Sequence, residues 1–388
     1  MTSPRQSIAL CLLALVTACS NGAAPAKPIT TGAATSARPS SSPSGPLAVS
    51  GIPPLLDPND LYAADRPGQL SATARLARSL VYVPNSGDGT VSVIDPATYR
   101  VIRTVKTGLQ PQHVTPGYDL KTLWVDDDHA NSLTPIDPAT GAFGKPVPVD
   151  DPYNLYFTAD GARAVVVAER LRRLDFRDPH TMALLHSLPV PCPGVDHMDF
   201  SADGTHALVS CEFGAKMIWV DMQRQVVVKS LLLRPGSMPQ DVKTSPDGKT
   251  FYVADMAHAG IYVIDAATIQ VTGFIPTGSN AHGLYVSRDS KTLYVTNRRG
   301  NSVSLLDLAT MKVKGNWPIP GGGTPDMGGV SADGKVLWLS GRYSREVYAL
   351  DTTDGRLLAR IRVGNGPHGL CVWPQPGRYS LGHTGTLR

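Results

Sequence analysis

Charged and aromatic residues are scarce in this sequence of 388 residues. Only 18% of the residues are charged and 6% are aromatic, and the net charge of +4 is scattered. Such a chain lacks the basic surface typical of nucleic-acid-binding proteins. Five cysteines are too few for a disulfide-rich scaffold, and no apolar run approaches the ~18 residues that span a bilayer. The sequence therefore argues against nucleic-acid-binding, disulfide-rich and membrane-spanning classes.

Glycine and proline, by contrast, are abundant. The 37 Gly and 33 Pro residues exceed average usage, which favours many short elements joined by turns over long helices. Leu, Val and Ile are plentiful, so the chain as a whole is not expected to be disordered.

A repeated segment decides the predicted fold. Seven alternating apolar strands end in aspartate at intervals of 38 to 46 residues, and turns such as SADG at residues 201–204 precede most of them. The seven strand-ending residues are Asp95, Asp137, Asp175, Asp221, Asp265, Asp307 and Asp351. Each interval accommodates about four strands, which is typical of a propeller blade. We therefore predict an all-β fold, a seven-bladed β-propeller spanning residues 51–388.

The two ends of the repeat predict how the ring closes. The first unit opens at Leu80 without an inner strand, whereas residues 367–373 supply one after the seventh unit. Pairing this last strand with the first blade removes open sheet edges. The flanking residues 55–78 and 378–388 are expected to pack over the outside of the ring.

The first 50 residues predict export and a lipid anchor. A basic residue, Arg5, precedes an apolar run from Ile8 to Val16, and a small residue then precedes Cys19, as in export signals. This pattern resembles the bacterial lipoprotein signal, which implies removal of residues 1–18 and a diacylglycerol group on Cys19; an ordinary cleaved signal is the alternative. Residues 19–50 are almost wholly Ala, Pro, Ser, Thr and Gly, and they predict a disordered tether. We therefore expect the protein on the outer face of the cell membrane, held by its lipid alone.

Two repeat strands carry a family resemblance. The sequences YVPN at residues 82–85 and YVTN at residues 294–297, each followed by an alternating strand that ends in aspartate, resemble the YVTN-repeat (YncE-like) propellers. The resemblance covers about residues 80–373. It implies an exported or surface-attached bacterial propeller, distantly similar to the haem d1 propeller of cytochrome cd1. The motif is specific for the fold and says little about activity.

Histidines recur at the start of the predicted innermost strands, which line the central channel. Four of the seven units place one there, although the chain has only ten; the four are His113, His197, His282 and His368. The spacing to the next turn aspartate is six residues for His113 and His197 but seven for His282, so not all four need face the channel. Neutral imidazoles suit Cu, Fe, Zn or haem iron. These four are the predicted metal ligands; the alternative is that they cap backbone groups around a water-filled channel.

Other polar residues lie at the starts of the first strands and the ends of the second strands. Strand ends on a rigid scaffold are frequent binding sites. The predicted ligand-binding residues of this channel rim are Asn154, Asp241, Asp326, Asp127, Glu169, Glu212, Asp255 and Arg342.

Two cysteines fall within one unit. Cys192 precedes an innermost strand and Cys211 ends the next strand. Antiparallel pairing would bring them together, which predicts a disulfide of the kind that persists outside the cytoplasm.

No catalytic motif accompanies these features. The sequence has no G-x-S-x-G elbow, no H-E-x-x-H pair and no C-x-x-C-H haem attachment. The favoured function is a non-enzymatic, monomeric, lipid-anchored propeller that binds a ligand, a metal or a surface protein at the channel rim. Two alternatives stay open: a redox protein that uses a transition metal or haem at the histidine ring, and a lactonase-like hydrolase that uses His197, Asp241 and Glu212.

Overall fold

The structure, a computed structural model, describes residues 51–388. The predicted signal peptide (residues 1–18), the tether (residues 19–50) and the predicted lipidation site Cys19 lie outside the described residues. Within residues 51–388, no helix combines the length and the apolar character that crossing a membrane requires. The helices there are the short 3-10 turns η1 (Ala63–Asp65), η2 (Ala74–Leu76), η3 (Asp128–Ala130) and η4 (Glu212–Gly214).

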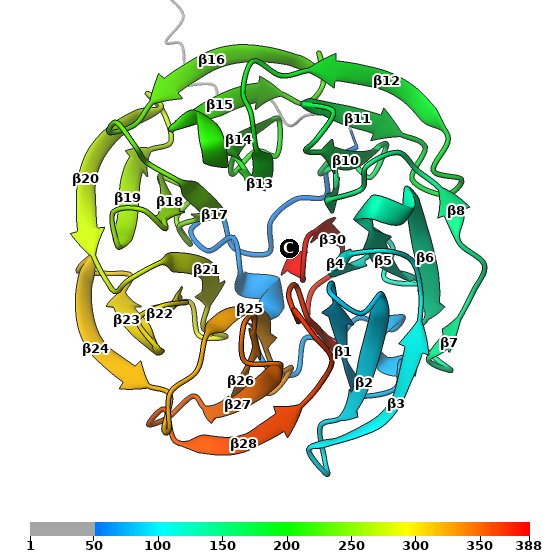
Figure 1. Cartoon of the computed structure of the whole chain (residues 1–388). Helices are drawn as coiled ribbons and strands as arrows, with labels where there is room; N and C mark the ends of the chain where they lie inside the picture. Colours follow the sequence, from blue (N-terminus) through cyan, green and yellow to red (C-terminus); the bar gives the residue numbers. More distant parts are fainter. Residues whose placement is uncertain (1–50) are drawn as a thin grey trace, which may run out of the picture. The chain divides into compact units, whose positions relative to one another are not determined.

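Seven antiparallel sheets form a ring, as Figure 1 shows, and the predicted seven-bladed β-propeller is confirmed. We call the region along the axis of the ring, bordered by the innermost strands, the channel. Blade one contains β29 (Cys371–Trp373), β1 (Leu80–Asn85), β2 (Thr90–Asp95) and β3 (Arg100–Lys106). Blade two contains β4 (Pro111–Pro116), β5 (Leu123–Asp127), β6 (Ser132–Asp137), β7 (Ala142–Phe143) and β8 (Val147–Pro148). Blade three contains β9 (Asn154–Phe157), β10 (Ala164–Ala168), β11 (Arg173–Arg177) and β12 (Leu184–Pro189).

The remaining four blades are regular. Blade four contains β13 (Val195–Phe200), β14 (His206–Cys211), β15 (Lys216–Asp221) and β16 (Val226–Leu232), and blade five contains β17 (Pro239–Thr244), β18 (Thr250–Asp255), β19 (Gly260–Asp265) and β20 (Gln270–Pro276). Blade six contains β21 (Ala281–Val286), β22 (Thr292–Asn297), β23 (Ser302–Asp307) and β24 (Lys312–Pro318), and blade seven contains β25 (Pro325–Val330), β26 (Val336–Gly341), β27 (Glu346–Asp351) and β28 (Leu357–Arg362).

Burial decreases from the channel outward and explains the strand patterns. The innermost strand β17 is buried along its length, whereas the outermost strand β20 is half-buried or exposed. Apolar side chains of the middle strands pack between neighbouring blades, as Val165 of blade three does in one cluster with Val209 of blade four. The core is thus a ring of interfaces between blades, held by the hydrophobic effect.

The repeated aspartates hold the turns after the third strands in every blade except the third. The prediction that Asp175 ends its strand is wrong: it lies within β11, and Asp178 accepts the turn hydrogen bonds from the His180 and Thr181 N–H groups. Asp95 accepts hydrogen bonds from the Ala97 N–H at 2.9 Å and the Thr98 hydroxyl at 3.0 Å. Tyr99 then adopts a left-handed φ of 56°. This is ordinary turn chemistry, and it accounts for the period of the sequence without any functional role for these residues.

The ring closes as the sequence predicts. On the inner edge of blade one, β1 pairs antiparallel with β29, with Val81 opposite Val372 and Tyr82 opposite Cys371. The C-terminal strand therefore completes the first blade.

The prediction that residues 378–388 pack over the outside of the ring is wrong. β30 (Ser380–Gly382) and β31 (Thr386–Leu387) extend the inner edge of blade three, and Gly382 pairs with Tyr156 of β9. The chain end accordingly lies near the centre of the ring in Figure 1. The His383 N–H donates to the Leu155 carbonyl at 2.8 Å. The tail thus pairs with backbone groups of β9 that face the channel.

Residues 55–78 cover one end of the channel and not the outer strands. The Leu61 N–H donates to the Pro246 carbonyl at 2.8 Å, and the Tyr62 hydroxyl donates to the Thr244 carbonyl at 2.7 Å. The Arg388 guanidinium lies 4.9 Å from the centroid of the Tyr62 ring. The N-terminal segment and the tail therefore meet at this end. We call the opposite end, where the second strands finish, the mouth.

Candidate histidine site in the channel

An extra residue in the innermost strands turns side chains into the channel near the mouth. In blade two this bulge contains Gln112 and His113, which together face the single residue Asp126. Equivalent irregularities occur in blades four to seven. His197 takes the same bulge position as His113, whereas His282 takes the position before it, which explains the difference in sequence spacing. Bulges of this kind re-aim side chains next to functional sites.

Three imidazoles meet within the channel. His113, His197 and His383 each offer a ring nitrogen, and these three nitrogens all lie within 4.8 Å of one another. The ring centroids are 5.5 Å apart for His113 and His197, 5.1 Å for His113 and His383, and 5.0 Å for His197 and His383. All three residues are at most 3% exposed. Three convergent nitrogens are a donor set for a transition-metal ion.

His113 is held as a neutral ring. Its Nδ1–H donates to the Tyr153 carbonyl at 2.9 Å, and Nε2 is left without a hydrogen-bond partner. Burial, followed by the charge of His197, lowers the pKa of His113 to about 3. A Cβ on Gly369 would collide with the His113 ring, so glycine is needed there for the close approach. A metal-binding histidine typically has its second nitrogen fixed in this way.

His197 has no hydrogen bond on either ring nitrogen. Its Nδ1 lies 2.8 Å from Asp196 Oδ1, but the two groups are not oriented as a hydrogen bond. Burial lowers the pKa of His197, yet the carboxylates of Asp196, Asp241 and Glu212 outweigh burial and raise it. The imidazole is therefore the most basic of the three, with carboxylates beside it.

His383 comes from the tail and was missed by sequence reasoning. Its Nδ1 faces the Asn154 side-chain amide, 3.0 Å from Nδ2 and 3.4 Å from Oδ1, while its Nε2 has no partner. The ring stacks on Tyr156 with centroids 6.0 Å apart. Burial and then the charge of His197 hold the pKa of His383 well below its usual value. The tail has no counterpart in the repeat, so the sequence around it, Gly382-His383-Thr384-Gly385, gave no signal that the imidazole enters the channel.

His282 and His368 are occupied by other side chains. Asp326 accepts from Nδ1 of His368 at 2.7 Å and lies 3.1 Å from Nδ1 of His282. The Arg298 guanidinium contacts Nε2 of His282 at 2.5 Å and donates to Asp326 at 2.6 and 2.8 Å. Burial followed by Arg298 lowers the pKa of His282, and burial followed by Arg342 lowers that of His368. These two histidines belong to a paired network, although the His368 and His113 centroids are only 4.9 Å apart.

Most of the predicted rim residues have local partners. Asp127, Asp241 and Asp255 each use both carboxylate oxygens on nearby amide, hydroxyl or imidazole groups. Arg342 donates to the Ser86 hydroxyl at 3.2 Å and the Gly366 carbonyl at 3.3 Å. Asn154 and Asp326 face histidines, as described above. The two other rim residues, Glu169 and Glu212, directly follow β10 and β14 at the mouth.

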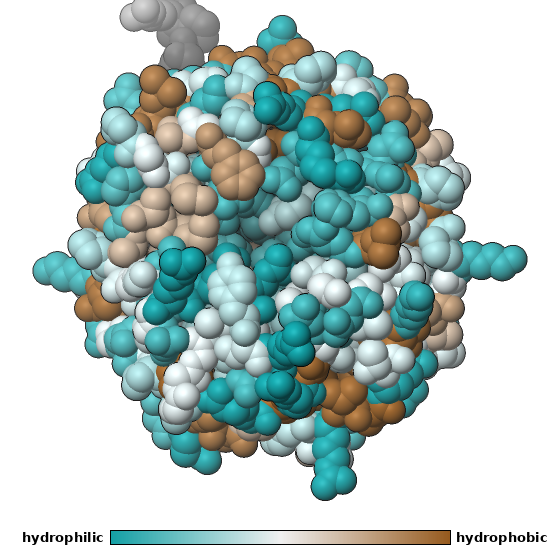
Figure 2. Space-filling model, in the orientation of Figure 1, coloured by the Kyte–Doolittle hydropathy of each residue, from teal (hydrophilic) through white to brown (hydrophobic). Residues whose placement is uncertain are grey.

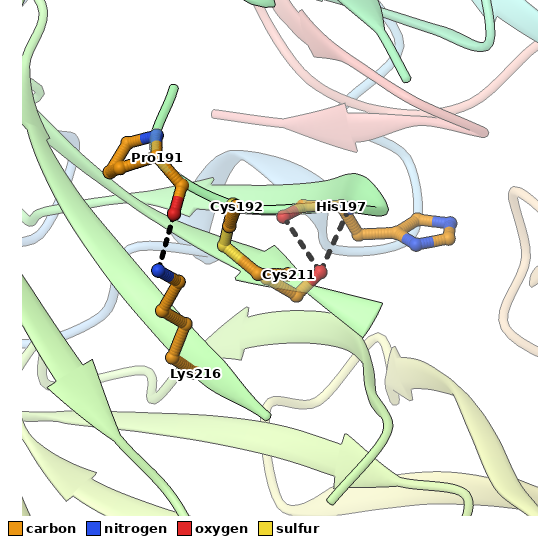
Figure 3. The surroundings of a disulfide bond; sticks show 6 residues. Pro191, Cys192, His197, Cys211 and Lys216 are labelled. Carbon is orange, nitrogen blue, oxygen red and sulfur yellow. Dashed lines mark hydrogen bonds between the residues drawn. A yellow bond between two sulfur atoms is a disulfide. The ribbon is translucent and has the colours of Figure 1, made fainter. Parts of the chain in front are cut away.

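A disulfide joins Cys192 to Cys211, with Cα atoms 5.8 Å apart. Figure 3 shows it beside the strand that carries His197, whose imidazole points away from the sulfur atoms. The His197 N–H donates to the Ser210 hydroxyl at 2.9 Å, and Lys216 Nζ donates to the Pro191 carbonyl. These contacts fix the backbone at the start of β13, next to His197.

The ring of blades and the histidines inside it define the class of protein, a seven-bladed propeller with a histidine-lined channel. The chain belongs to the YNCE-like beta-propeller family, whose model matches residues 47–377. No curated protein matches it.

Solved structures share the fold. Kuenenia stuttgartiensis hydrazine synthase is 20% identical with a TM-score of 0.62, and the match covers 72% of this chain and 94% of that chain. The dihydro-heme d1 dehydrogenase NirN, solved in complex with DHE, is 17% identical with a TM-score of 0.60, covering 80% and 79%. A functionally unknown protein from Desulfotomaculum acetoxidans is 16% identical with a TM-score of 0.64, covering 76% and 99%.

Proposed function

We propose that this chain is an exported, lipid-anchored metal-binding protein that holds one transition-metal ion between His113, His197 and His383. One observation carries the proposal: four ring nitrogens of these residues are buried without a hydrogen bond. Leaving a buried polar atom unpaired costs about 1–3 kcal/mol. Coordination of a metal ion would remove that cost for one nitrogen on each ring.

The chemistry of the three imidazoles limits which metal ions can bind. Imidazole suits Cu, Zn, Ni or Fe better than Mg or Ca. The lowered pKa values of His113 and His383 mean that protons do not compete for these rings at neutral pH. Three protein ligands leave a coordination position for a water or a small ligand.

The role we assign is binding without catalysis. Asp241, one of the two carboxylates considered for water activation, is held by the Val242 and Leu284 amides, from which it accepts at 2.9 and 2.8 Å. A haem does not fit between the three rings, because their centroids are only 5.0 to 5.5 Å apart and β30 lies beside them. The likeness to hydrazine synthase and to the dehydrogenase NirN, at 20% identity or less, supports the fold alone.

The metal proposal is tested by elemental mass spectrometry of the full-length protein, exported in its host and purified from membranes. Wild type is expected to carry about one equivalent of Cu, Zn, Ni or Fe per chain, or to take it up on reconstitution. The triple variant His113→Ala/His197→Ala/His383→Ala should carry none. A matched control, His129→Ala/His180→Ala/His186→Ala, removes three exposed histidines and should bind as wild type does.

Each outcome decides the proposal. Metal retained by the first triple variant, or no metal on wild type after reconstitution with each of the four ions, overturns it. Equal loss from both triple variants would mean that exposed histidines bind the metal, which also overturns it.

The anchor is tested separately. Cys19→Ser should move the protein from the membrane fraction to the soluble exported fraction, and mass spectrometry of the wild-type N-terminal peptide should detect the diacylglycerol group. An unchanged membrane fraction for Cys19→Ser would contradict the lipid anchor and leave the metal site unaffected.

A further inference from the structure

Polar groups border the axis of the ring, and Figure 2 shows a hydrophilic hollow at the centre of the face it draws. A small cavity lies between the innermost strands at the end that residues 55–78 cover. Its volume of about 40 Å³ corresponds to about three water molecules. Three parts of the chain line the cavity: the N-terminal segment, the innermost strands of blades five to seven, and the tail. The cavity is therefore enclosed by the same segments that close this end of the channel.

A glycine leaves this space open. Gly329 of β25 lies opposite Trp338 of β26. The same register position holds Lys243 in blade five and Tyr285 in blade six. A Cβ on Gly329 would meet no atom closer than 3.6 Å, so crowding does not require a glycine there. Blade seven thus lacks a side chain that its two neighbours have, and the cavity takes its place.

Two positively charged side chains line the cavity and have unused hydrogen-bond donors. Lys243 is 7% exposed. Of its three ammonium donors, one is used on the Thr386 hydroxyl at 3.2 Å, and the described residues offer no second acceptor. Arg288 is 8% exposed and donates through Nη2 to the Val330 carbonyl at 2.6 Å. Its Nη1 makes no hydrogen bond within residues 51–388 and is 3.9 Å from the nearest carboxylate, that of Asp65.

Asp65 of η1 is the only carboxylate that lines the cavity. The residue is 6% exposed, and its Oδ1 accepts no hydrogen bond from the described part of the chain. Its Oδ2 lies 3.9 Å from Nη1 of Arg288, which is too far for a hydrogen bond. Burial, partly offset by the basic residues nearby, raises the pKa of Asp65 to about 6, so the carboxylate is ionised at pH 8. Buried polar groups without partners are unfavourable, and a ligand with both acceptors and a donor would satisfy them.

We propose that this cavity binds a small oxyanion that carries its own hydroxyl group, of the bicarbonate class. One negative charge on the ligand matches the lining side chains, of which two are positive and one is negative. The anionic oxygens accept from Lys243 and Arg288, and the hydroxyl donates to Asp65. Hydrogen bonds between charged groups are stronger than neutral ones. The site goes beyond the proposed transition-metal function, because none of the three metal-binding histidines lines the cavity.

The test is a calorimetric titration of the full-length protein at pH 8 with sodium bicarbonate and, at equal ionic strength, with sodium nitrate. Nitrate has the same planar shape and charge but no hydroxyl, so it leaves Asp65 without a donor. We expect one bicarbonate per chain and about tenfold weaker binding of nitrate. Asp65→Asn supplies an amide donor of its own and should bind the two anions with similar affinity. Absence of saturable bicarbonate binding, or equal affinities for the two anions on wild type, would mean that the cavity holds only water, and overturns the proposal.

Three single variants test the lining of the cavity. Lys243→Met removes the ammonium group at a similar side-chain length and should weaken bicarbonate binding about tenfold or more. Lys249→Met, the matched control, changes an exposed lysine and should bind as wild type does. Gly329→Ala adds a methyl group for which there is room, leaves the charges unchanged, and should weaken binding by filling part of the cavity. Unchanged affinity in Lys243→Met, or in Gly329→Ala if Lys243→Met does not fold, overturns the site.

The three-histidine variant separates this cavity from the metal site. His113→Ala/His197→Ala/His383→Ala should keep the bicarbonate affinity of wild type. Loss of bicarbonate binding in that variant would mean that the anion binds at the metal, and overturns the cavity site. Bicarbonate binding without any transition metal on wild type would instead overturn only the three-histidine site.

Discussion

Histidines lie on both sides of the channel, but their ring nitrogens differ in hydrogen bonding. On the side of blades two to four, His113 and His197 keep unpartnered ring nitrogens, and the tail adds a third on His383. On the side of blades six and seven, Asp326 and Arg298 engage His282, and Asp326 also holds His368. We call the side of His282 and His368, whose rings bind other side chains, the paired side. We call the side of His113, His197 and His383, which keep unpartnered ring nitrogens, the open side or open donor set. Repeat position alone therefore does not determine whether a channel histidine is available to a ligand.

The difference arises in the partner of an acidic residue that both sides have. Asp326 in blade seven and Asp196 in blade four occupy the same bulge position. Asp326 meets Arg298, which follows β22, whereas no arginine binds Asp196. The identity of the residue after the neighbouring second strand decides which carboxylate is neutralised.

The largest effect is expected from breaking the paired side. Asp326→Asn leaves the buried Arg298 guanidinium without its charged partner, and breaking a buried pair costs about 3–5 kcal/mol. Urea denaturation should reveal that loss, whereas Asp333→Asn on the surface should change the free energy of unfolding by less than about 0.5 kcal/mol. A loss below 1 kcal/mol for Asp326→Asn would contradict the paired network.

On the open side, a disulfide bond in blade four stabilises the fold. Cys192→Ser/Cys211→Ser removes a bond that closes a sequence separation of 19 residues, and a loop of this size predicts a loss of about 3 kcal/mol. Denaturation of wild type under reducing conditions is the control and should give the same loss. Unchanged stability in both would mean that the disulfide does not constrain blade four.

The smallest effect on metal content is expected on the paired side. His282→Ala/His368→Ala should leave the metal content at one equivalent per chain and change affinity by less than about threefold, because neither residue belongs to the open donor set. His113→Ala/His197→Ala is the matched double variant and should abolish binding. Equal loss of metal from both double variants, measured by elemental analysis, would mean that the histidines of both sides bind the metal.

The fold was predictable and the site only in part. Strand-ending aspartates such as Asp95 and Asp265 recur because each turn needs one, so the blade count can be read from the sequence. His113 and His197 were also predictable, because they mark bulges in the repeat. His383 was not, since the tail enters the channel through pairing with β9, which no local pattern encodes. The pairing of His282 depends on Asp326 and Arg298, which are distant in sequence and are brought together by closure of the ring.

The three-histidine site is tested most directly by anomalous scattering from crystals of the metal-loaded protein, recorded at the absorption edge of the bound ion. We expect one peak about 2.0–2.1 Å from a ring nitrogen of each of His113, His197 and His383. A peak between His282 and His368, or no peak within the channel, would contradict it.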